Sequence, residues 1–372
     1  MSHWNRIAPF SSDHQPRRLE RWEYRRNDGR VRAFDVEVQT GKSLDVLALK
    51  GTNLNDIRSY SEFLQRTAAR LYGERLSAQP RHNCPICRSS LQNAAVELQV
   101  FGVPYVRCAD CGHVAVGLQA DAAALGRVFE ESEKHSEAYV DKAAIDTRMK
   151  QIIAPKLEWC IRHYRQCRGR EPVRLLDVGA GGGHFVAGAQ RHGLKAEGFE
   201  KSRASRAFAK EAFGIDLRSE EFTRTESVPA DIVTFWGLLE YLQEPREFLA
   251  AARRAIAPDG MLVVEVPRVD ALGTRVQAVQ GASIARHMDP TTHINAFSDE
   301  SLCTALVEEG FGPVAAWYFG MDAYETMIQA ALKADDTAFV SAFSSWIPVL
   351  QQSADIGRQC DDVIVAAVSM RE

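Results

Sequence analysis

The sequence predicts an α/β protein in which a doubly wound parallel sheet occupies the second half of the chain. Two observations support this prediction. From residue 172 onward, short apolar runs typical of buried strands alternate with segments of helical periodicity. In the first of these units, the apolar run 173–178 leads directly into a glycine-rich loop, and a helix is expected to begin near His184. A strand, a glycine turn and a helix N-terminus together form a site for a nucleotide-like ligand.

Length and composition indicate the number of structural units and the general class of protein. A chain of 372 residues is expected to form two or three units. Its 45% hydrophobic and 25% charged residues are ordinary for a globular protein, and a net charge of −4 does not indicate nucleic acid or membrane binding. The polar N-terminus lacks a signal-peptide core, and no run approaches the ~18 apolar residues of a membrane span. We therefore expect a cytoplasmic protein, while the oligomeric state stays open.

The first 80 residues are expected to form an extension that contains a hairpin and a helix. Residues 19–26 and 31–38 flank Asn27-Asp28-Gly29, a strong turn signal. A helix is expected over about residues 56–72, with Asn53 or Asn55 as its cap. Seven arginines lie in or beside the hairpin: Arg17, Arg18, Arg21, Arg25, Arg26, Arg30 and Arg32. They fit a site for a phosphate-bearing acceptor or nucleic acid, but interspersed acids favour a solvated strand face or a protein contact.

Two cysteine pairs predict a metal site in residues 81–115. Cys84 and Cys87 form one CxxC turn, and Cys108 and Cys111 form a second one twenty residues later. Two such turns at this spacing indicate a zinc ribbon, with strands expected at 96–101 and 103–107. Four thiolates leave no open coordination position, which favours structural Zn²⁺ over a catalytic metal or a redox dithiol. The four other cysteines are scattered, which favours a reducing compartment. The ribbon is expected to be a scaffold, with binding of a partner or acceptor as the alternative.

Residues 116–170 are expected to form a mostly helical connector. Tyr139 and Arg148 are its residues of interest, because the segment leads directly into the glycine loop and can fold over a bound cofactor. The alternative is simple packing of a connecting helix.

From residue 171 to residue 372, the expected elements alternate. After 173–178, strands are expected at 195–199, 215–217, 231–235, 261–266, 314–319 and 362–369. Helices are expected at about 184–192, 203–213, 245–256, 298–309, 323–332 and 337–351.

The spacing of the glycines identifies the kind of loop. A dinucleotide fingerprint needs glycine at positions one, three and six, and the sixth position here is His184. The phosphate-loop pattern also fails, because no Gly-Lys-Ser/Thr follows. The chain instead has Asp177 followed by alternate glycines, Gly179, Gly181 and Gly183. This pattern resembles the first motif of class I S-adenosylmethionine (SAM) methyltransferases.

Further segments in order strengthen this resemblance. Glu200 ends the next strand, where an acid is placed to accept hydrogen bonds from both ribose hydroxyls. Residues 231–242, 257–262, 293–298 and 309–311 resemble later motifs of the family. One branch carries a similar N-terminal zinc ribbon and includes small-molecule methyltransferases, among them sugar C-methyltransferases. The resemblance implies a seven-stranded Rossmann-like domain over 171–372, with its last strand inserted antiparallel. It also implies methyl transfer from SAM to a small-molecule or carbohydrate acceptor.

The sequence departs from many relatives after the fourth strand of this domain. Glu240-Tyr241 stands where they carry Glu-His, and Tyr241, with an unperturbed pKa near ~10, does not readily replace the histidine as base or metal ligand. Gly237 replaces an acid that metal-assisted relatives use. A metal-dependent O-methyltransferase is therefore disfavoured.

The candidate site residues follow from these motifs. His293 is the first choice for the base, followed by His287 and Glu240, while Tyr241 would orient the acceptor. For His293 the alternative is a structural hydrogen bond. On the cofactor side, Asp177 would hold the loop or the methionine amino group, and Glu221 would meet the adenine amino group. The other cofactor candidates are Gly179, Gly181, Gly183, Glu200 and Trp236. Trp236 is nearly as consistent with a core aromatic.

Two other functions stay open at this stage. An RNA methyltransferase would use the ribbon and the arginine hairpin to hold phosphates, although the chain is net acidic and lacks an Asn-Pro-Pro-Tyr-like motif after the fourth strand. A non-catalytic protein would bind SAM or a partner without methyl transfer.

Overall fold

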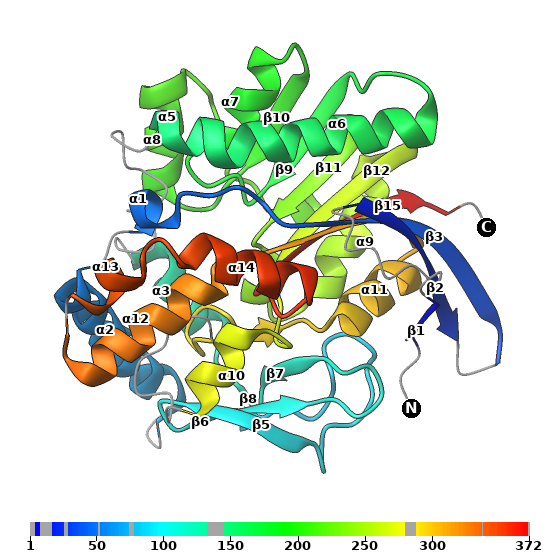
Figure 1. The fold of residues 1–372 in the computed structure, drawn as a ribbon. Coiled ribbons are helices and arrows are strands. Elements are labelled where there is room, and N and C mark those ends of the chain that lie inside the picture. Colours follow the sequence, from blue (N-terminus) through cyan, green and yellow to red (C-terminus); the bar gives the residue numbers. More distant parts are fainter. Residues whose placement is uncertain are drawn as a thin grey trace.

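The computed structural model describes residues 4–7, 17–25, 29–50, 53–73, 78–131, 145–279, 288–336 and 338–370. Within these ranges, nine strands form one twisted sheet in the order β1-β2-β3-β14-β15-β12-β11-β9-β10 (Figure 1). The strands are β1 (Trp4–Ile7), β2 (Arg17–Arg25), β3 (Val31–Thr40), β9 (Arg174–Val178), β10 (Lys195–Phe199), β11 (Ala230–Trp236), β12 (Ile256–Pro267), β14 (Phe311–Phe319) and β15 (Asp362–Ser369).

The strand directions confirm the expected α/β class. β10, β9, β11 and β12 run parallel to one another. The final strand, β15, lies antiparallel between β12 and β14, as the resemblance implied. β10 lies on one side of β9, and the next strand along the chain, β11, lies on the other side of β9. The strand order therefore reverses between β9 and β11, and open α/β sheets bind their ligands at such a point, beyond the carboxyl ends of the strands.

The sheet differs from the expected seven strands at both edges. Residues 215–217, expected as a strand beside β10, form no strand, and this edge is closed by a single parallel bridge between Phe199 and Arg218. Gly214 ends the preceding helix in a left-handed conformation, which leaves the chain little length to pair before it turns away. At the opposite edge, β3 pairs with β14 in parallel, so the N-terminal hairpin extends the main sheet.

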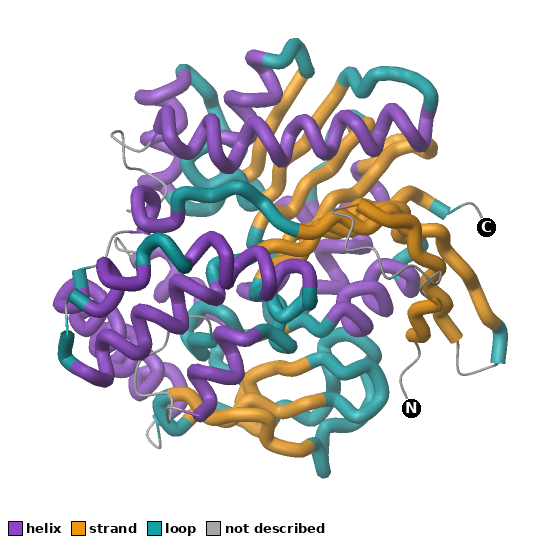
Figure 2. The backbone as a smooth tube through the Cα atoms, in the orientation of Figure 1, coloured by secondary structure: helices purple, strands orange, loops and turns teal. Residues whose placement is uncertain are grey.

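Helices cover both faces of the parallel strands (Figure 2). One face packs against α6 (Ala154–Arg168), α7 (His184–Arg191) and α8 (Arg203–Phe213), and the other against α9 (Pro245–Ala255) and α11 (Asp299–Glu308). Three of their starts have clear chemical causes. Ser202 caps α8, Pro245 begins α9, and Ser298 forms a capping box with Ser301 at α11.

A second layer lies below the carboxyl edge of the sheet in Figure 1. Part of it is helical: α1 (Val46–Lys50), α2 (Leu54–Tyr72), α12 (Asp322–Ala334), α13 (Phe339–Phe343) and α14 (Ile347–Ile356) share one apolar cluster, and α10 (Leu272–Val279) contacts α12. Asn53 caps α2, as expected. Among the helices in the described ranges, none combines the length and apolarity needed to cross a membrane.

The cysteine-rich unit forms the rest of this layer. Its strands β5 (Ala95–Val100), β6 (Val103–Arg107) and β7 (Val114–Val116) form an antiparallel sheet that is completed by β13 (Asn295–Ala296). Two short strands, β4 (Gln79–Pro80) and β8 (Leu118–Gln119), pair beside it. The connector then continues through α3 (Ala122–Glu131), α5 (Ile145–Arg148) and a π-helical turn (Met149–Ile153) into α6. Tyr139 lies outside the described residues.

Candidate active site

The glycine loop connects β9 to α7 at the point where the strand order reverses. Gly179, Gly181 and Gly183 all have positive φ angles, of 75°, 51° and 75°. Residues other than glycine rarely adopt a backbone conformation with positive φ, which explains why glycine occupies these three alternate positions. The loop is fixed to the neighbouring strand because the N–H groups of Gly179 and Ala180 both donate to the Phe199 carbonyl oxygen, at 2.9 Å.

Glu200 lies beside this loop, at the open end of β10. Its Oε2 accepts a hydrogen bond from the Gly181 N–H at 2.8 Å, and its Oε1 accepts one from the Ser202 N–H at 2.6 Å. The carboxylate is half-buried. The structure thus brings Glu200 and the three glycines together, although they are separated by up to 21 positions in the sequence.

Asp177 is buried one strand residue before the loop. Its Oδ1 accepts a hydrogen bond from the Thr234 hydroxyl at 2.6 Å, which ties β9 to β11 beneath the loop. Burial raises the pKa of Asp177 to about 7, and the nearby charge of Glu200 adds to this rise, although the Thr234 hydrogen bond opposes it. The side chain therefore braces the strands that carry the site.

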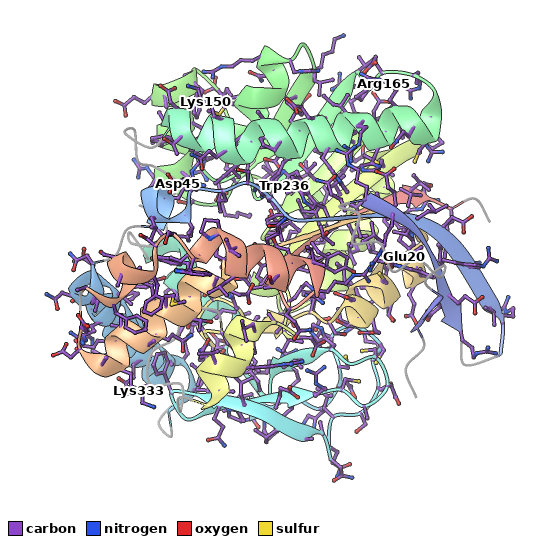
Figure 3. All side chains as sticks on the ribbon, in the orientation of Figure 1. Glu20, Asp45, Lys150, Arg165, Trp236 and Lys333 are labelled. Carbon is purple, nitrogen blue, oxygen red and sulfur yellow. The ribbon has the colours of Figure 1, made fainter. Side chains whose placement is uncertain are left out.

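Trp236 ends β11 on the same edge. Figure 3 labels it near the middle of the molecule, below α6. Its ring packs against Phe185 in the first turn of α7, with centroids 4.7 Å apart, and Lys156 Nζ lies 4.7 Å from its centroid. Its buried Nε1 has no hydrogen-bond partner among the described residues. Trp236 is thus a partly buried core-side aromatic whose Nε1 has no hydrogen-bond partner among the described residues.

Glu221 lies further along the same edge, just before a short 3-10 turn (Phe222–Arg224). It is half-buried, and its Oε2 pairs with Lys201 Nζ at 3.1 Å. The neighbouring Phe222 is buried against Phe199 and Phe235. The ring belongs to the core, whereas the Glu221 carboxylate pairs with the lysine that follows Glu200.

Glu240 and Tyr241 lie in a 3-10 turn (Leu239–Tyr241) that follows β11. Glu240 is buried, its Oε2 has no partner among the described residues, and burial raises its pKa well above the usual range. The ring of Tyr241 meets the ring of His293 edge-on at 5.4 Å between centroids. The structure therefore brings Tyr241 and His293 together, whereas the Glu240 carboxyl lies beside Gly237, and His287 lies outside the described residues.

The cysteine-rich unit holds the segment that carries His293. The Tyr105 hydroxyl donates to the His293 carbonyl oxygen at 2.8 Å, and Asn295 pairs with Ala115 across β13 and β7. His113 Nε2 lies 3.1 Å from Asn295 Oδ1. His113 is thus engaged with this segment and is not a metal-ligand candidate.

The four paired cysteines converge as the spacing predicted. All four Sγ atoms lie within 4.8 Å of one another, with Cys84–Cys111 at 3.6 Å and Cys87–Cys108 at 3.5 Å. Four thiolates around a tetrahedral Zn²⁺, with Zn–S bonds of about 2.3 Å, would be about 3.8 Å apart. The donor set and its dimensions fit a closed tetrahedral metal site.

A cluster of charges that the sequence analysis missed lies beside Trp236. It contains Lys42 from the segment after β3, Lys156 from α6, Glu265 from β12 and Asp362 at the start of β15. Lys156 Nζ hydrogen-bonds to Glu265 Oε2. Charge interactions link Lys42 to the other three groups. Because these residues come from four distant segments, no local pattern in the sequence marks them.

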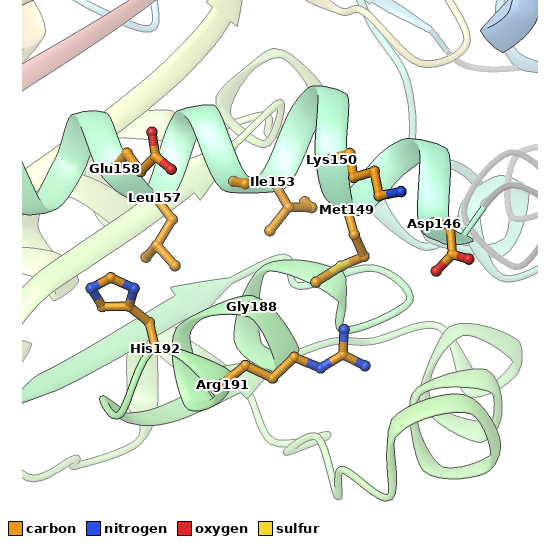
Figure 4. A pocket seen from close by; sticks show the side chains of 10 residues that line it. Asp146, Met149, Lys150, Ile153, Leu157, Glu158, Gly188, Arg191 and His192 are labelled. Atoms are coloured by element: carbon orange, nitrogen blue, oxygen red, sulfur yellow. The ribbon is translucent and has the colours of Figure 1, made fainter.

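A cavity of about 390 Å³ lies elsewhere, between α6 and the C-terminal half of α7 (Figure 4). Its lining includes Met149, Lys150, Leu157, Arg191 and His192. It contains none of the predicted site residues.

Comparison with known proteins agrees with this geometry. Residues 146–316 match the family model described as "Methyltransferase domain". The ubiquinone biosynthesis O-methyltransferase of Caulobacter sp. (strain K31) is 26% identical over 143 residues, which are 36% of this chain and 57% of the relative. The enzyme of the same name from Alkalilimnicola ehrlichii is 30% identical over 107 residues, which are 26% of this chain and 43% of the relative. The chain therefore spans about half the length of the curated relatives that it matches.

Among solved structures, the magnesium protoporphyrin IX methyltransferase from Synechocystis PCC 6803 with bound SAH aligns with a TM-score of 0.46 and 12% identity. The alignment covers 67% of this chain and 100% of that one. The family match, which covers 171 of the 372 residues, agrees with the motifs, the glycine loop and the strand order of this part of the chain.

Proposed function

We propose that the chain is a class I SAM-dependent methyltransferase that acts on a small-molecule or carbohydrate acceptor. The observation that carries the proposal is the group formed by the left-handed glycine loop and Glu200 at the point where the strand order reverses. Backbone N–H groups at this loop and a carboxylate at the next strand suit the amino-acid and ribose parts of a nucleoside ligand. The partial likeness to O-methyltransferases supports a small-molecule acceptor.

The residues divide into donor and acceptor sides. On the donor side, Gly179, Gly181 and Gly183 would line the ligand, Glu200 would accept the ribose hydroxyls, and Glu221 and Trp236 would flank it. When bound, SAM supplies a methyl group on a positively charged sulfur, so the leaving group needs no acid. The protein's contribution is therefore alignment and, where the acceptor must lose a proton, a base.

On the acceptor side, we place the base among His293, His287 and Glu240. The backbone carbonyl of His293 accepts a hydrogen bond from the Tyr105 hydroxyl, which ties this part of the chain to the cysteine-rich unit. Tyr241, edge-on to that ring, would orient the acceptor. Glu240 has an unpartnered buried oxygen, which is free to meet a polar group of the acceptor.

The arginine hairpin gives an RNA acceptor little support. Arg18 pairs with buried Glu20 at 2.6 Å, and Arg21 Nη1 lies 3.6 Å from Asp35. These arginines are partly neutralised by acids of the same hairpin, as expected for a solvated strand face.

The methyltransferase proposal is tested by donor binding and by transfer. Calorimetric titration with SAH is expected to show one site per chain. Asp177→Ala and Glu200→Ala should each weaken it, while the exposed Asp216→Ala is the control. Unchanged SAH affinity in both site variants would make the assignment of the loop wrong. Labelled SAM incubated with fractionated cell extract then shows whether label enters small-molecule, glycan or RNA fractions. SAH binding without labelling of any fraction would favour a non-catalytic protein.

We also propose that Cys84, Cys87, Cys108 and Cys111 hold one structural Zn²⁺. The metal would fasten the two turns to each other, and structural zinc contributes on the order of 10 kcal/mol in small zinc units. Metal analysis is expected to find one zinc per chain, which is lost in Cys87→Ser and retained in Cys167→Ser, a variant of an exposed cysteine outside the cluster. Equal zinc content in both variants would contradict the assignment.

A further inference from the structure

A buried hydrogen-bond relay joins the cysteine-rich unit to the turn that follows β11. Asn295 in β13 donates from its Nδ2 group to two backbone carbonyl oxygens of this turn, at 3.2 Å to Leu239 and at 2.5 Å to Leu242. The Asn295 Oδ1 lies 3.1 Å from His113 Nε2. Asn295 and His113 are 0% and 1% exposed, so these hydrogen bonds are shielded from water. The relay therefore reaches both ends of the turn that carries two of the acceptor-side candidates.

The partners determine which atoms of the relay carry protons. Carbonyl oxygens can only accept, so the Asn295 amide must present its NH2 group to the turn and its oxygen to His113. His113 Nε2 must then donate, which selects the form of the imidazole that carries a proton on Nε2. His113 Nδ1 lies 3.4 Å from the Ser301 hydroxyl oxygen, and the imidazole packs against the Phe297 ring at 4.8 Å between centroids. The orientation of the Asn295 amide is thus set by a fixed imidazole.

The backbone of His113 is itself tied to the second cysteine turn. Its carbonyl oxygen accepts a hydrogen bond from the Cys108 N–H at 2.8 Å. Residues 243–246, which follow the turn after β11, contact residues 86–120 at three further points. These are Gln243 with the Ala120 carbonyl oxygen, Glu244 with Arg88, and Arg246 with the Ile86 carbonyl oxygen. The cysteine-rich unit therefore holds this part of the chain from Leu239 to the first turn of α9.

Tyr241 and His293 lie on the two segments that the relay connects. The Tyr241 ring meets the His293 ring edge-on at 5.4 Å between centroids. Tyr241 belongs to the turn that Asn295 holds, and His293 lies two residues before Asn295 in the sequence. Asn295 therefore fixes the turn against the segment that carries His293, and with it the relative position of the two rings.

We propose that Asn295 and His113 are positioning residues, which hold Tyr241 against His293 on the acceptor side of the site. The inference rests on the proposed methyltransferase function, and it adds two residues that are too deeply buried to touch donor or acceptor. Without the His113 donor, the Asn295 amide is no longer held in one orientation, and the carbonyl oxygens of the turn lose their fixed partner. A buried carbonyl without a partner is unfavourable, so the turn is expected to shift.

The test follows the ring pair by NMR of protein that contains isotope-labelled histidine. His293→Gln identifies the His293 signal, and Tyr241→Leu gives its position without the neighbouring ring. The wild type is expected to carry a proton on His113 Nε2. His113→Phe and Asn295→Asp should both move the His293 Cε1–H signal towards its position in Tyr241→Leu. His113→Gln, which keeps a donor, should restore the wild-type position, and His82→Gln, at an exposed site of the same unit, is the matched control.

The urea unfolding midpoint and the SAH affinity are measured on every variant. A purely structural role would lower the midpoint of His113→Phe and leave the His293 signal of the folded protein at its wild-type position, and that result would overturn the inference. A wild-type His113 without a proton on Nε2 would overturn it as well. Should His113→Phe fail to fold, the Nε2 proton of the wild type and the His293 signal of Asn295→Asp decide.

Methyl transfer separates this inference from the function beneath it. In the extract fraction that takes label from SAM, His113→Phe should transfer label about tenfold more slowly than the wild type, with unchanged SAH affinity, and His113→Gln should recover the rate. A wild-type rate in His113→Phe would overturn the positioning role while the methyltransferase proposal stands. If the wild type labels no fraction, the proposed function fails, and the His293 signal alone then shows whether the relay holds the ring pair.

Discussion

Asp177 is expected to destabilise the free protein above neutral pH. Its pKa is about 7 when folded, against an ordinary value of 3.8, so the folded state binds this proton more tightly than the unfolded state. Stability therefore falls as the pH rises from about 4 to about 7 and changes no further above that range. A difference of about three pKa units corresponds to about 4 kcal/mol, because one unit is worth about 1.36 kcal/mol.

Asp177→Asn removes this pH-dependent penalty while keeping an oxygen that can accept the Thr234 hydrogen bond. We expect the variant and the wild type to unfold in urea with similar free energies at pH 4.5. At pH 8 the variant should be more stable, by up to about 4 kcal/mol. An equal difference at both pH values would refute the reasoning.

Two further variants serve as comparisons for this measurement. Asp355 in α14 is also buried, and burial together with the charge of Asp322 raises its pKa to about 7. Asp355→Asn should therefore show the same sign of pH-dependent stabilisation without any effect on SAH binding, because its partner is Gln351 and not the glycine loop. Asp216→Asn, at an exposed site, should show no pH-dependent difference.

Three further substitutions test the packing around the site by urea or thermal unfolding. Gly198→Ala would place a Cβ 2.8–2.9 Å from three neighbouring side chains and should lower the free energy of unfolding by about 1–3 kcal/mol. Gly126→Ala, with open space around it in α3, is the control and should be neutral or stabilising. Equal effects of the two substitutions would contradict this reasoning. Ser298→Ala removes the capping box of α11 and should cost about 1 kcal/mol, and a loss below a few tenths would show that the cap is unimportant. Tyr105→Phe removes the hydrogen bond to the His293 carbonyl oxygen and should cost about 1 kcal/mol. An unchanged unfolding midpoint would refute the coupling of the cysteine-rich unit to this segment.

The parts of the site that could be predicted are those encoded locally. A left-handed glycine, a capping serine and a CxxC turn each depend on a few neighbouring residues, so Gly179, Ser202 and Cys84 could be read directly from the sequence. The antiparallel insertion of the last strand came from the family resemblance, since a strand pattern alone does not give direction.

The parts that could not be predicted depend on pairing between distant segments. The hairpin at residues 17–40 was expected as a hairpin, but its pairing with β14, about 280 positions away, has no local signal. The same holds for the pairing of β13 with β7. Residues 215–217 differ in the other direction, because a strand was expected there and none forms. This apolar run has strand character, but it is too short to pair with β10.

These long-range pairings determine what the N-terminal segment does. Because β3 covers the edge of β14, the protein without its first 45 residues would expose the backbone of residues 315–318 as an unpaired edge and would also lose Gly41. The strand that completes this edge of the sheet and Gly41, whose backbone bonds to Tyr318 and Trp317, are therefore parts of one continuous segment. In the function that we propose, the donor side lies within residues 174–236, and the acceptor side includes the His293 segment that Tyr105 of the cysteine-rich unit contacts.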